Sequence, residues 1–155
     1  MTQGPNIKFN PLKVFVSLLV LSFLLNLLFS FNIKIPIFFN IIGFFFLIIF
    51  FTLFFVSARM FIKYNEKLPP HTPTERIIKT GIYSYSRNPI YLAFIGFHFS
   101  MFLVFENTWY LFSSIILFFW INNYVIFREE KYLERRFNDE YARYKKNVAR
   151  WISFK

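Results

Sequence analysis

Charged residues are absent from four long stretches of this 155-residue chain and gather between and after them. The charge-free stretches are residues 14–33, 35–58, 88–105 and 107–127. A helix needs about 20 apolar residues to cross the hydrocarbon core of a bilayer. The pattern therefore predicts four membrane-spanning helices, at about residues 12–32, 36–58, 90–105 and 108–127.

Short connections join these spans in pairs. "NIKIP" joins the first two, and its Pro36 suits the first turn of a helix. "FENTW" joins the last two, and either Asn107 or Thr108 can cap the fourth helix. Each pair is expected to form an antiparallel hairpin, the first of them over residues 12–58.

The first apolar run is preceded by Lys8 and Lys13, as in a signal peptide. However, the run covers residues 14–31, which is longer than the apolar region of a signal peptide, and no small-residue cleavage site follows it. We expect a retained helix.

Positive charge predicts the orientation. The chain has 18 Lys and Arg residues against 8 Asp and Glu residues, and most of the positive ones lie in residues 59–89 or beyond residue 127. Because positive residues collect on the cytoplasmic side, both termini and the 59–89 loop are expected in the cytoplasm. The net charge of +10 then suits anionic membrane lipids, and no nucleic-acid partner is expected.

Composition supports a membrane protein. Hydrophobic residues make up 56% of the chain, whereas soluble domains have about 45–50%. The absence of cysteine excludes disulfides, thiolate metal sites and cysteine nucleophiles. His71 and His98 are isolated, so no metal site is expected, and His98 is interpreted as a hydrogen-bonded bundle residue. We predict an all-α fold, a multi-pass membrane helix bundle with a single domain over residues 1–155.

The first of two polar segments is "GIYSYSRNPIYL", residues 81–92. Three prolines before it prevent a continuous helix, and Gly81 allows a tight turn. Pro89 suits the first turn of the third span, so the segment lies at the positive end of a helix dipole. Such a position favours a carboxylate or phosphate. Alternatively, Arg87 only anchors a helix end and the tyrosines form an interfacial belt.

The second polar segment is "FREEKYLERRFNDEYARYKKNVARWI". Its apolar residues recur at steps of three and four, which predicts an amphipathic cytoplasmic helix on the membrane surface. Asn138 can break this helix, because asparagine tolerates a left-handed turn. Glu129 and Glu130 follow the fourth span directly, and such a pair is costly unless it meets water, an arginine or a cationic ligand. Alternatively, the pair is a solvated first turn.

Together the two segments resemble the isoprenylcysteine carboxyl methyltransferase and phospholipid methyltransferase group, as a small prokaryotic member. That group carries G-x-Y-x-x-x-R-[HN]-P-x-Y, a helix hairpin, and E-E-x-x-L-x-x-x-F-G-x-x-Y-x-x-Y. The resemblance covers residues 68–152, which are interpreted as the methyltransferase core. Asn88 stands where the eukaryotic enzymes have histidine, although R-N-P is also a familiar variant of the motif. Ala93 replaces a frequent glycine, Asn138 replaces the glycine of "FG", and Arg128 is shifted from the arginine expected late in the fourth span.

The resemblance implies an integral-membrane methyltransferase that uses S-adenosylmethionine and acts on a hydrophobic or lipidated acceptor. The acceptor would be an isoprenylcysteine-like carboxylate or a phospholipid-like amine, with carboxyl O-methylation favoured. Glu130 is the candidate catalytic base for an amine, and Arg128 the candidate substrate-binding residue. The candidate cofactor-binding residues are Arg76, Ile77, Ile78, Tyr83, Asn88, Pro89, Ile90, Tyr91 and Glu129.

Two other functions fit the same pattern. Sterol and steroid reductases have a similar R-x-P-x-Y turn and use NADPH, but they usually carry asparagine where this chain has Ile90. A membrane scaffold without catalytic activity is the second alternative. The paired glutamates and the tyrosines favour an enzyme over a scaffold.

Overall fold

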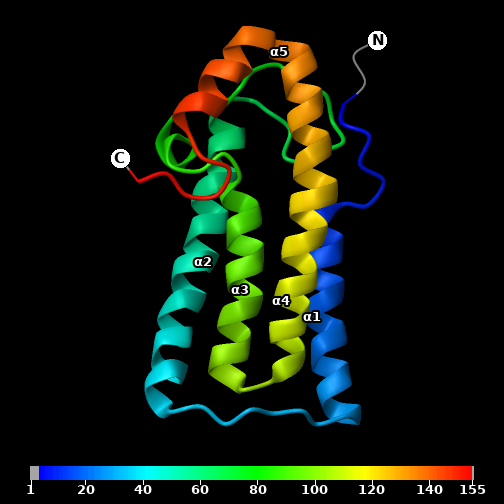
Figure 1. Ribbon diagram of the computed structural model, residues 1–155, viewed down its shortest axis with the longest axis vertical. Coiled ribbons are helices and arrows are strands. Elements are labelled where there is room, and N and C mark those ends of the chain that lie inside the picture. Colours follow the sequence, from blue (N-terminus) through cyan, green and yellow to red (C-terminus); the bar gives the residue numbers. More distant parts are fainter. Residues whose placement is uncertain (1–3, 155) are drawn as a thin grey trace.

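The computed structural model describes residues 4–154, and those residues form helices and loops without a β-strand (Figure 1). The long helices are α1 (Pro11–Leu28), α2 (Ile37–Lys63), α3 (Pro89–Phe105), α4 (Thr108–Trp120) and α5 (Phe127–Asn147). A short 3-10 helix, η1 (Gly81–Ser84), precedes α3, and a π-helix, η2 (Ile121–Ile126), joins α4 to α5. The predicted all-α membrane bundle is confirmed.

Helices α3 and α4 form an antiparallel hairpin at the centre of the bundle. Helix α2 packs along α3, and α1 packs along α4, so α1 and α2 lie on opposite sides (Figure 1). Asn107 caps α4 by accepting a 3.0 Å hydrogen bond from the backbone N–H of Trp109, as predicted. Pro89 occupies the first turn of α3, also as predicted.

The expected hairpin of the first two spans takes a different form. Helices α1 and α2 run in opposite directions, but each packs on its neighbour in the central hairpin instead of on the other. Their connection crosses the α3–α4 turn, where the N–H of Ile33 donates to the carbonyl of Glu106 at 3.0 Å. An ion pair of 2.7 Å between Lys34 and Glu106 also holds it there. The turn thus separates the two helices that a short connection was expected to pair.

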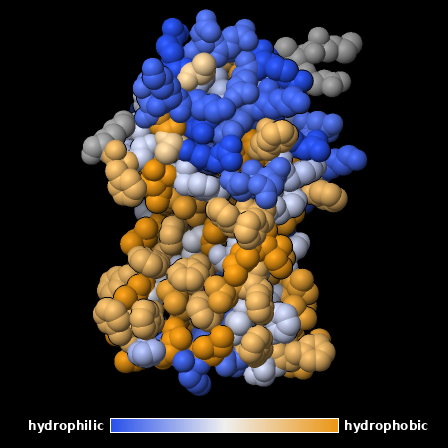
Figure 2. Space-filling view, viewed as in Figure 1, coloured by the Kyte–Doolittle hydropathy of each residue, from blue (hydrophilic) through white to orange (hydrophobic). Residues whose placement is uncertain are grey.

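A wide apolar band covers the face of the bundle seen in Figure 2. Within residues 4–154, three helices are long and apolar enough to cross a membrane: Pro11–Leu28, Ile37–Lys63 and Thr108–Asn147, the last of which includes α4, η2 and α5. Pro89–Phe105 is a shorter apolar helix. Figure 2 shows the band, with a large polar cap at the end that contains α5. The described chain begins and ends at this capped end (Figure 1).

Small and polar residues position the helices inside the band. A Cβ added at Gly43 would lie 2.5 Å from the Cβ of Leu103, so this glycine lets α2 and α3 approach closely. His98 is buried, with Nδ1 2.6 Å from the hydroxyl of Ser113 and Nε2 3.3 Å from the carbonyl oxygen of Phe15. Its interpretation as a hydrogen-bonded bundle residue is confirmed.

Helix α5 extends α4 out of the apolar band and then turns back over the polar end (Figure 1). The turn occurs at Asn138, where φ is 41° and ψ is −117°, so the expected break is confirmed. The apolar stripe of the helix does not face the membrane surface. Its residues Tyr141, Tyr144 and Val148 are buried and pack with Ile77. The expected surface location is therefore wrong for this stripe, because the loop before α3 supplies its apolar partner.

Candidate functional site

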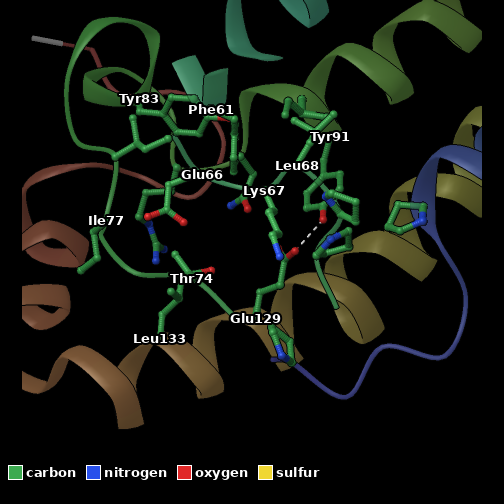
Figure 3. A pocket seen from close by; sticks show the side chains of 18 of the residues that line it. Phe61, Glu66, Lys67, Leu68, Thr74, Ile77, Tyr83, Tyr91, Glu129 and Leu133 are labelled. Atoms are coloured by element: carbon green, nitrogen blue, oxygen red, sulfur yellow. Dashed lines mark hydrogen bonds between the residues drawn. The ribbon is translucent and has the colours of Figure 1, made fainter. Parts of the chain in front are cut away.

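A cavity of about 200 Å³ lies at the polar end, between the N-terminus of α3 and the first turns of α5 (Figure 3). The loop of residues 64–80 covers one side of it. Residues of α1 and α2 complete the wall, so the cavity is built from most of the chain. Its lining includes Phe54, Phe61, Glu66, Lys67, Arg76, Ile77, Ile78, Tyr83, Arg87, Asn88, Ile90, Tyr91, Phe94, Glu129, Glu130, Leu133, Tyr141 and Tyr144.

The segment "GIYSYSRNPIYL" forms the wall next to α3. Gly81 has a φ of 59°, a left-handed conformation that glycine adopts at little cost, and this lets η1 begin. The N–H of Asn88 donates to the hydroxyl of Ser86 at 3.1 Å, just before α3 starts. The first N–H groups of α3 have no carbonyl partner within the helix, and Ile90 and Tyr91 of this turn line the cavity.

Tyr91 and Glu129 face each other across the cavity. The phenol of Tyr91 donates a 2.6 Å hydrogen bond to Oε1 of Glu129 (Figure 3). Glu129 lies beyond the charge-free part of its helix and is half-buried. Burial raises the pKa of its carboxyl to about 7, although the hydrogen bond from Tyr91 lowers it. A cationic ligand would stabilise the ionised carboxylate, so this position is suited to bind one.

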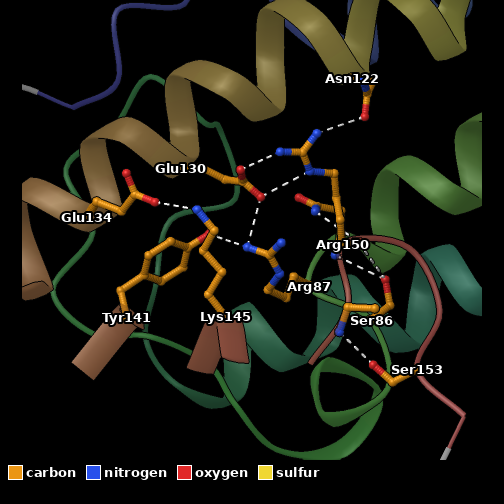
Figure 4. Close-up of polar contacts among 11 residues, drawn as sticks. Ser86, Arg87, Asn122, Glu130, Glu134, Tyr141, Lys145, Arg150 and Ser153 are labelled. Carbon is orange, nitrogen blue, oxygen red and sulfur yellow. Dashed lines mark hydrogen bonds and ion pairs between the residues drawn. The ribbon is translucent and has the colours of Figure 1, made fainter. Parts of the chain in front are cut away.

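Glu130 points into an ion-pair cluster (Figure 4). Its Oε1 lies 2.8 Å from Nη1 of Arg87, and its Oε2 lies 2.6 Å from Nη2 of Arg150. Arg87 also donates to the hydroxyl of Tyr141 at 3.1 Å, and burial raises the pKa of that phenol to about 12. Because arginines occupy both carboxylate oxygens, the geometry does not support Glu130 as a general base.

Sequence comparison identifies the chain. A family model described as phospholipid methyltransferase matches residues 38–140. The chain belongs to the phospholipid methyltransferase family. The match runs from α2 into α5, and it contains the first polar segment and the part of the second that carries Glu129 and Glu130.

The chain is also similar to an uncharacterized protein of Haemophilus influenzae. The two are 55% identical over 38 residues, which is 24% of this chain and 60% of that protein. The match thus spans less than two thirds of that protein's length.

The polar cavity brings together the residues predicted from sequence except Pro89 and Arg128. Pro89 begins α3 and shapes the cavity through the backbone. Arg128 points elsewhere, with its guanidinium carbon 4.4 Å from the ring centre of Tyr124 and Nη1 donating to the carbonyl of Asn6 at 2.8 Å. These contacts give no support to its predicted role in substrate binding.

The loop of residues 64–80 contributes residues that sequence reasoning missed. The carboxylate of Glu66 accepts hydrogen bonds from the N–H groups of Glu75 and Arg76, which closes the loop on itself. The hydroxyl of Tyr132 accepts from the N–H of Thr74 at 3.1 Å and ties the loop to α5. Tyr132 follows the paired glutamates in the motif, which was a usable signal, whereas nothing in the sequence marks Glu66.

A second, apolar cavity of about 170 Å³ lies between α1 and α2, and residues of α3 form its floor. Because α1 and α2 are on opposite sides of the central hairpin, this groove follows the gap between them. Leu12, Phe54 and Phe94 line both cavities. The groove therefore adjoins the polar cavity within the apolar band.

No group of three or more His, Cys, Asp or Glu side chains converges to hold a metal ion within residues 4–154. The acidic residues near the cavity instead contact a tyrosine, arginines or backbone N–H groups. The chemistry available at the site is that of carboxylates, phenols and backbone donors.

Proposed function

We propose that this protein transfers a methyl group from S-adenosylmethionine to a hydrophobic acceptor at the cytoplasmic face of the membrane. The observation that carries the proposal is the Tyr91–Glu129 pair, which lies in a polar cavity that adjoins an apolar groove. S-adenosylmethionine has a sulfonium cation, an ammonium group, a carboxylate and an adenine ring. The cavity has a counterpart for each.

Glu129 would meet the cationic part of the donor. A carboxylate can accept a hydrogen bond from the ammonium group and attract the sulfonium. Tyr83 and Tyr91 offer aromatic faces, for which a cation–π contact contributes about 0.5–2 kcal/mol. Both rings belong to the cavity wall next to Glu129.

The donor carboxylate would lie at the N-terminus of α3. Asn88 and Ile90 line this part of the cavity, and the helix dipole favours an anion there. The Nε of Arg87 has no hydrogen-bond partner among the described residues and is a further donor. The adenine would lie against Arg76, Ile77 and Ile78, which come from the opposite wall.

The reaction itself is a direct displacement. The bond from sulfur to the methyl carbon breaks as the acceptor forms its own bond to that carbon, and neutral S-adenosylhomocysteine is released. The protein has to align the reactants and exclude water. A carboxylate acceptor needs no base at neutral pH. Because both oxygens of Glu130 are occupied, the geometry favours a lipidated carboxylate over an amine.

The hydrocarbon part of the acceptor would occupy the groove between α1 and α2. Aromatic side chains from both helices line it, and three of its residues reach the polar cavity. A lipid can enter such a groove sideways from the bilayer. Residues 68–152 would then form the core of the cofactor site, while the first two helices hold the acceptor chain.

The polar end is assigned to the cytoplasm on the positive-inside rule. Since the chain has no cysteine, a single cysteine introduced in the loop of residues 64–80 gives a clean labelling site. It should react with an impermeant thiol reagent only when the cytoplasmic side is exposed. Labelling from the opposite side of sealed vesicles would contradict the assignment.

Ligand titration of the purified protein tests the donor. We expect binding of S-adenosylmethionine and S-adenosylhomocysteine but not of NADPH. Arg143→Ala, which changes an exposed residue on the far part of α5, should bind like the wild type. A folded protein that binds neither adenosyl ligand would exclude the proposal, and binding of NADPH instead would favour a reductase.

A further inference from the structure

The C-terminal residues 148–153, here called the C-terminal strap, lie across the segment that precedes α3. The N–H of Arg87 donates to the carbonyl of Ala149 at 3.1 Å, and the N–H of Ser153 donates to the carbonyl of Tyr85 at 2.7 Å. The side-chain amide of Asn88 donates to the carbonyl of Arg150 at 3.1 Å. The strap thus holds both the backbone and a side chain of the segment that forms the cavity wall.

Arg150 adds side-chain contacts from the middle of the strap (Figure 4). Its Nη2 and Nε donate to the two carboxylate oxygens of Glu130, at 2.6 and 3.2 Å. Its Nη1 donates to Oδ1 of Asn122 in the π-helix at 3.1 Å. A planar guanidinium can make these three contacts at once, whereas a lysine ammonium cannot reproduce the paired geometry.

The contacts of Arg150 converge on buried groups. The side chain of Glu130 is 9% exposed and that of Arg87 is 8% exposed, while Arg150 itself is 33% exposed and forms the outer side of the cluster. Ion pairs between buried groups are far less screened than surface pairs. Glu130 therefore depends on Arg150 as well as on Arg87 to keep one orientation.

The cavity has two polar walls, the segment that leads into α3 and the first turn of α5, and both are connected to this cluster. Arg87 lies just before Asn88 at the start of α3, and Glu130 follows Glu129 in the first turn of α5. We propose that Arg150 is a positioning residue, which acts through Glu130 and Arg87 to hold these two walls at the spacing that the methyl donor requires. This inference rests on the proposed function, because it takes the cavity to be the donor site.

We expect the fold to persist without these contacts. Helix α5 is covalently continuous with α4 through the π-helix, and its buried tyrosines pack with Ile77 independently of Arg150. Loss of the guanidinium should leave the helices in place and loosen the segment around Arg87. The effect should therefore appear at the site before it appears in global stability.

Arg150→Ala tests the inference with two measurements. The first is amide hydrogen exchange of residues 85–91 in the ligand-free protein, where we expect faster exchange. The second is the dissociation constant for S-adenosylhomocysteine, which should rise by about tenfold, a typical coupling between groups in one network. Arg143→Ala is the matched control and should change neither. Arg150→Lys should restore binding only in part, since it keeps the charge and loses the paired contacts.

A double variant separates positioning from general stabilisation. If Arg150 acts through Glu130, combining Arg150→Ala with Glu130→Gln should weaken binding by less than the product of the two single effects. Wild-type exchange rates in Arg150→Ala, or two fully independent effects, would overturn the inference. A wild type that does not bind the ligand would contradict the proposed function instead, and the exchange measurement would still decide the role of Arg150. Should Arg150→Ala fail to fold, Asn122→Ala removes one of the three contacts and is expected to give the same changes at smaller size.

Discussion

Tyr91 and Glu129 join α3 to α5 across the cavity through a hydrogen bond of 2.6 Å. The tyrosine comes from one polar segment and the glutamate from the other, and the central helix hairpin separates them in sequence. This contact brings the two segments into one site.

Tyr91→Phe keeps the aromatic face and removes the hydroxyl. We expect S-adenosylhomocysteine to bind between about threefold and tenfold more weakly, because Glu129 loses a hydrogen bond that fixes its orientation. Isothermal titration in detergent measures the change. Unchanged affinity together with an unchanged helix content would show that this hydrogen bond does not order the site.

Binding of S-adenosylmethionine should strengthen as the pH rises through about 7. The raised pKa of Glu129 means that its carboxyl is partly protonated below this value, whereas the cationic donor requires the carboxylate. Glu129→Gln removes the titrating group. The affinity of this variant for S-adenosylmethionine should be lower than that of the wild type and nearly independent of pH between about 5.5 and about 7.5, a range that lies around the raised pKa. The same pH dependence in both proteins would assign the titration to another group.

The raised pKa of Glu129 has the opposite consequence for the stability of the ligand-free protein, which should fall as the pH rises. The folded-state pKa of Glu129 is above its unfolded value of 4.5, so the folded protein binds more protons between the two values. The contribution of Glu129 to the free energy of unfolding is therefore present below the unfolded pKa and is lost as pH rises towards 7. Thermal unfolding across this range should show the decline in the wild type and a smaller one in Glu129→Gln.

Glu130→Gln distinguishes an ion-pair role from catalysis. The substitution leaves Arg87 buried without its carboxylate partner, which typically costs about 3 kcal/mol. We expect a clear fall in the thermal unfolding midpoint and faster amide exchange near Arg87. A general base would give the reverse result, namely lost turnover with normal stability, as judged from assays with carboxylate and amine acceptors.

Asn138→Gly should stabilise the protein by up to about 1 kcal/mol, because glycine adopts the φ of 41° at Asn138 with less strain. Asn138→Ala should destabilise it by a similar amount. The unfolding midpoint measures both variants. Each serves as the control for the other, because opposite effects are expected at one position. If alanine is tolerated as well as glycine, the kink is not strained.

Ala93→Val tests the groove between α1 and α2. Ala93 is 1% exposed and lines this groove but not the polar cavity, so the added methyl groups should reduce the space for an acyl or prenyl chain. Methylation of a long-chain acceptor should fall more than that of a short-chain one, while S-adenosylhomocysteine binding stays constant. Equal losses for both acceptors would mean that the groove does not hold the chain.

Local features of this fold were predictable from sequence because they depend on near neighbours. Asn107 caps α4 and Pro89 opens α3 through contacts within one or two residues. The partner of α1 was not predictable, since a short connection does not reveal that it passes a turn of another hairpin. The buried face of α5 was likewise determined by a loop some 60 residues away in sequence.

The roles of the paired glutamates show a further limit. Glu129 and Glu130 are adjacent, and sequence alone assigned one to the donor and the other to proton transfer. Which of them contacts Tyr91 and which contacts the arginines depends on the π-helix before them, because each extra residue in a helix turns the following side chains by about 100°. Arg150, which pairs with Glu130, lies 20 residues further along.

The helix that runs from Thr108 to the kink at Asn138 connects the site mechanically to the bilayer. At 1.5 Å per residue this rod is about 45 Å long, with residues 108–127 in the predicted span and Glu129 just beyond them. A change in hydrophobic thickness alters the tilt of a membrane span. Tilting the rod by about 5° would move a point 30 Å along it by roughly 2.5 Å, comparable to a hydrogen-bond length. A change in bilayer thickness should therefore change the spacing of the site residues and, with it, the rate of the proposed methyl transfer.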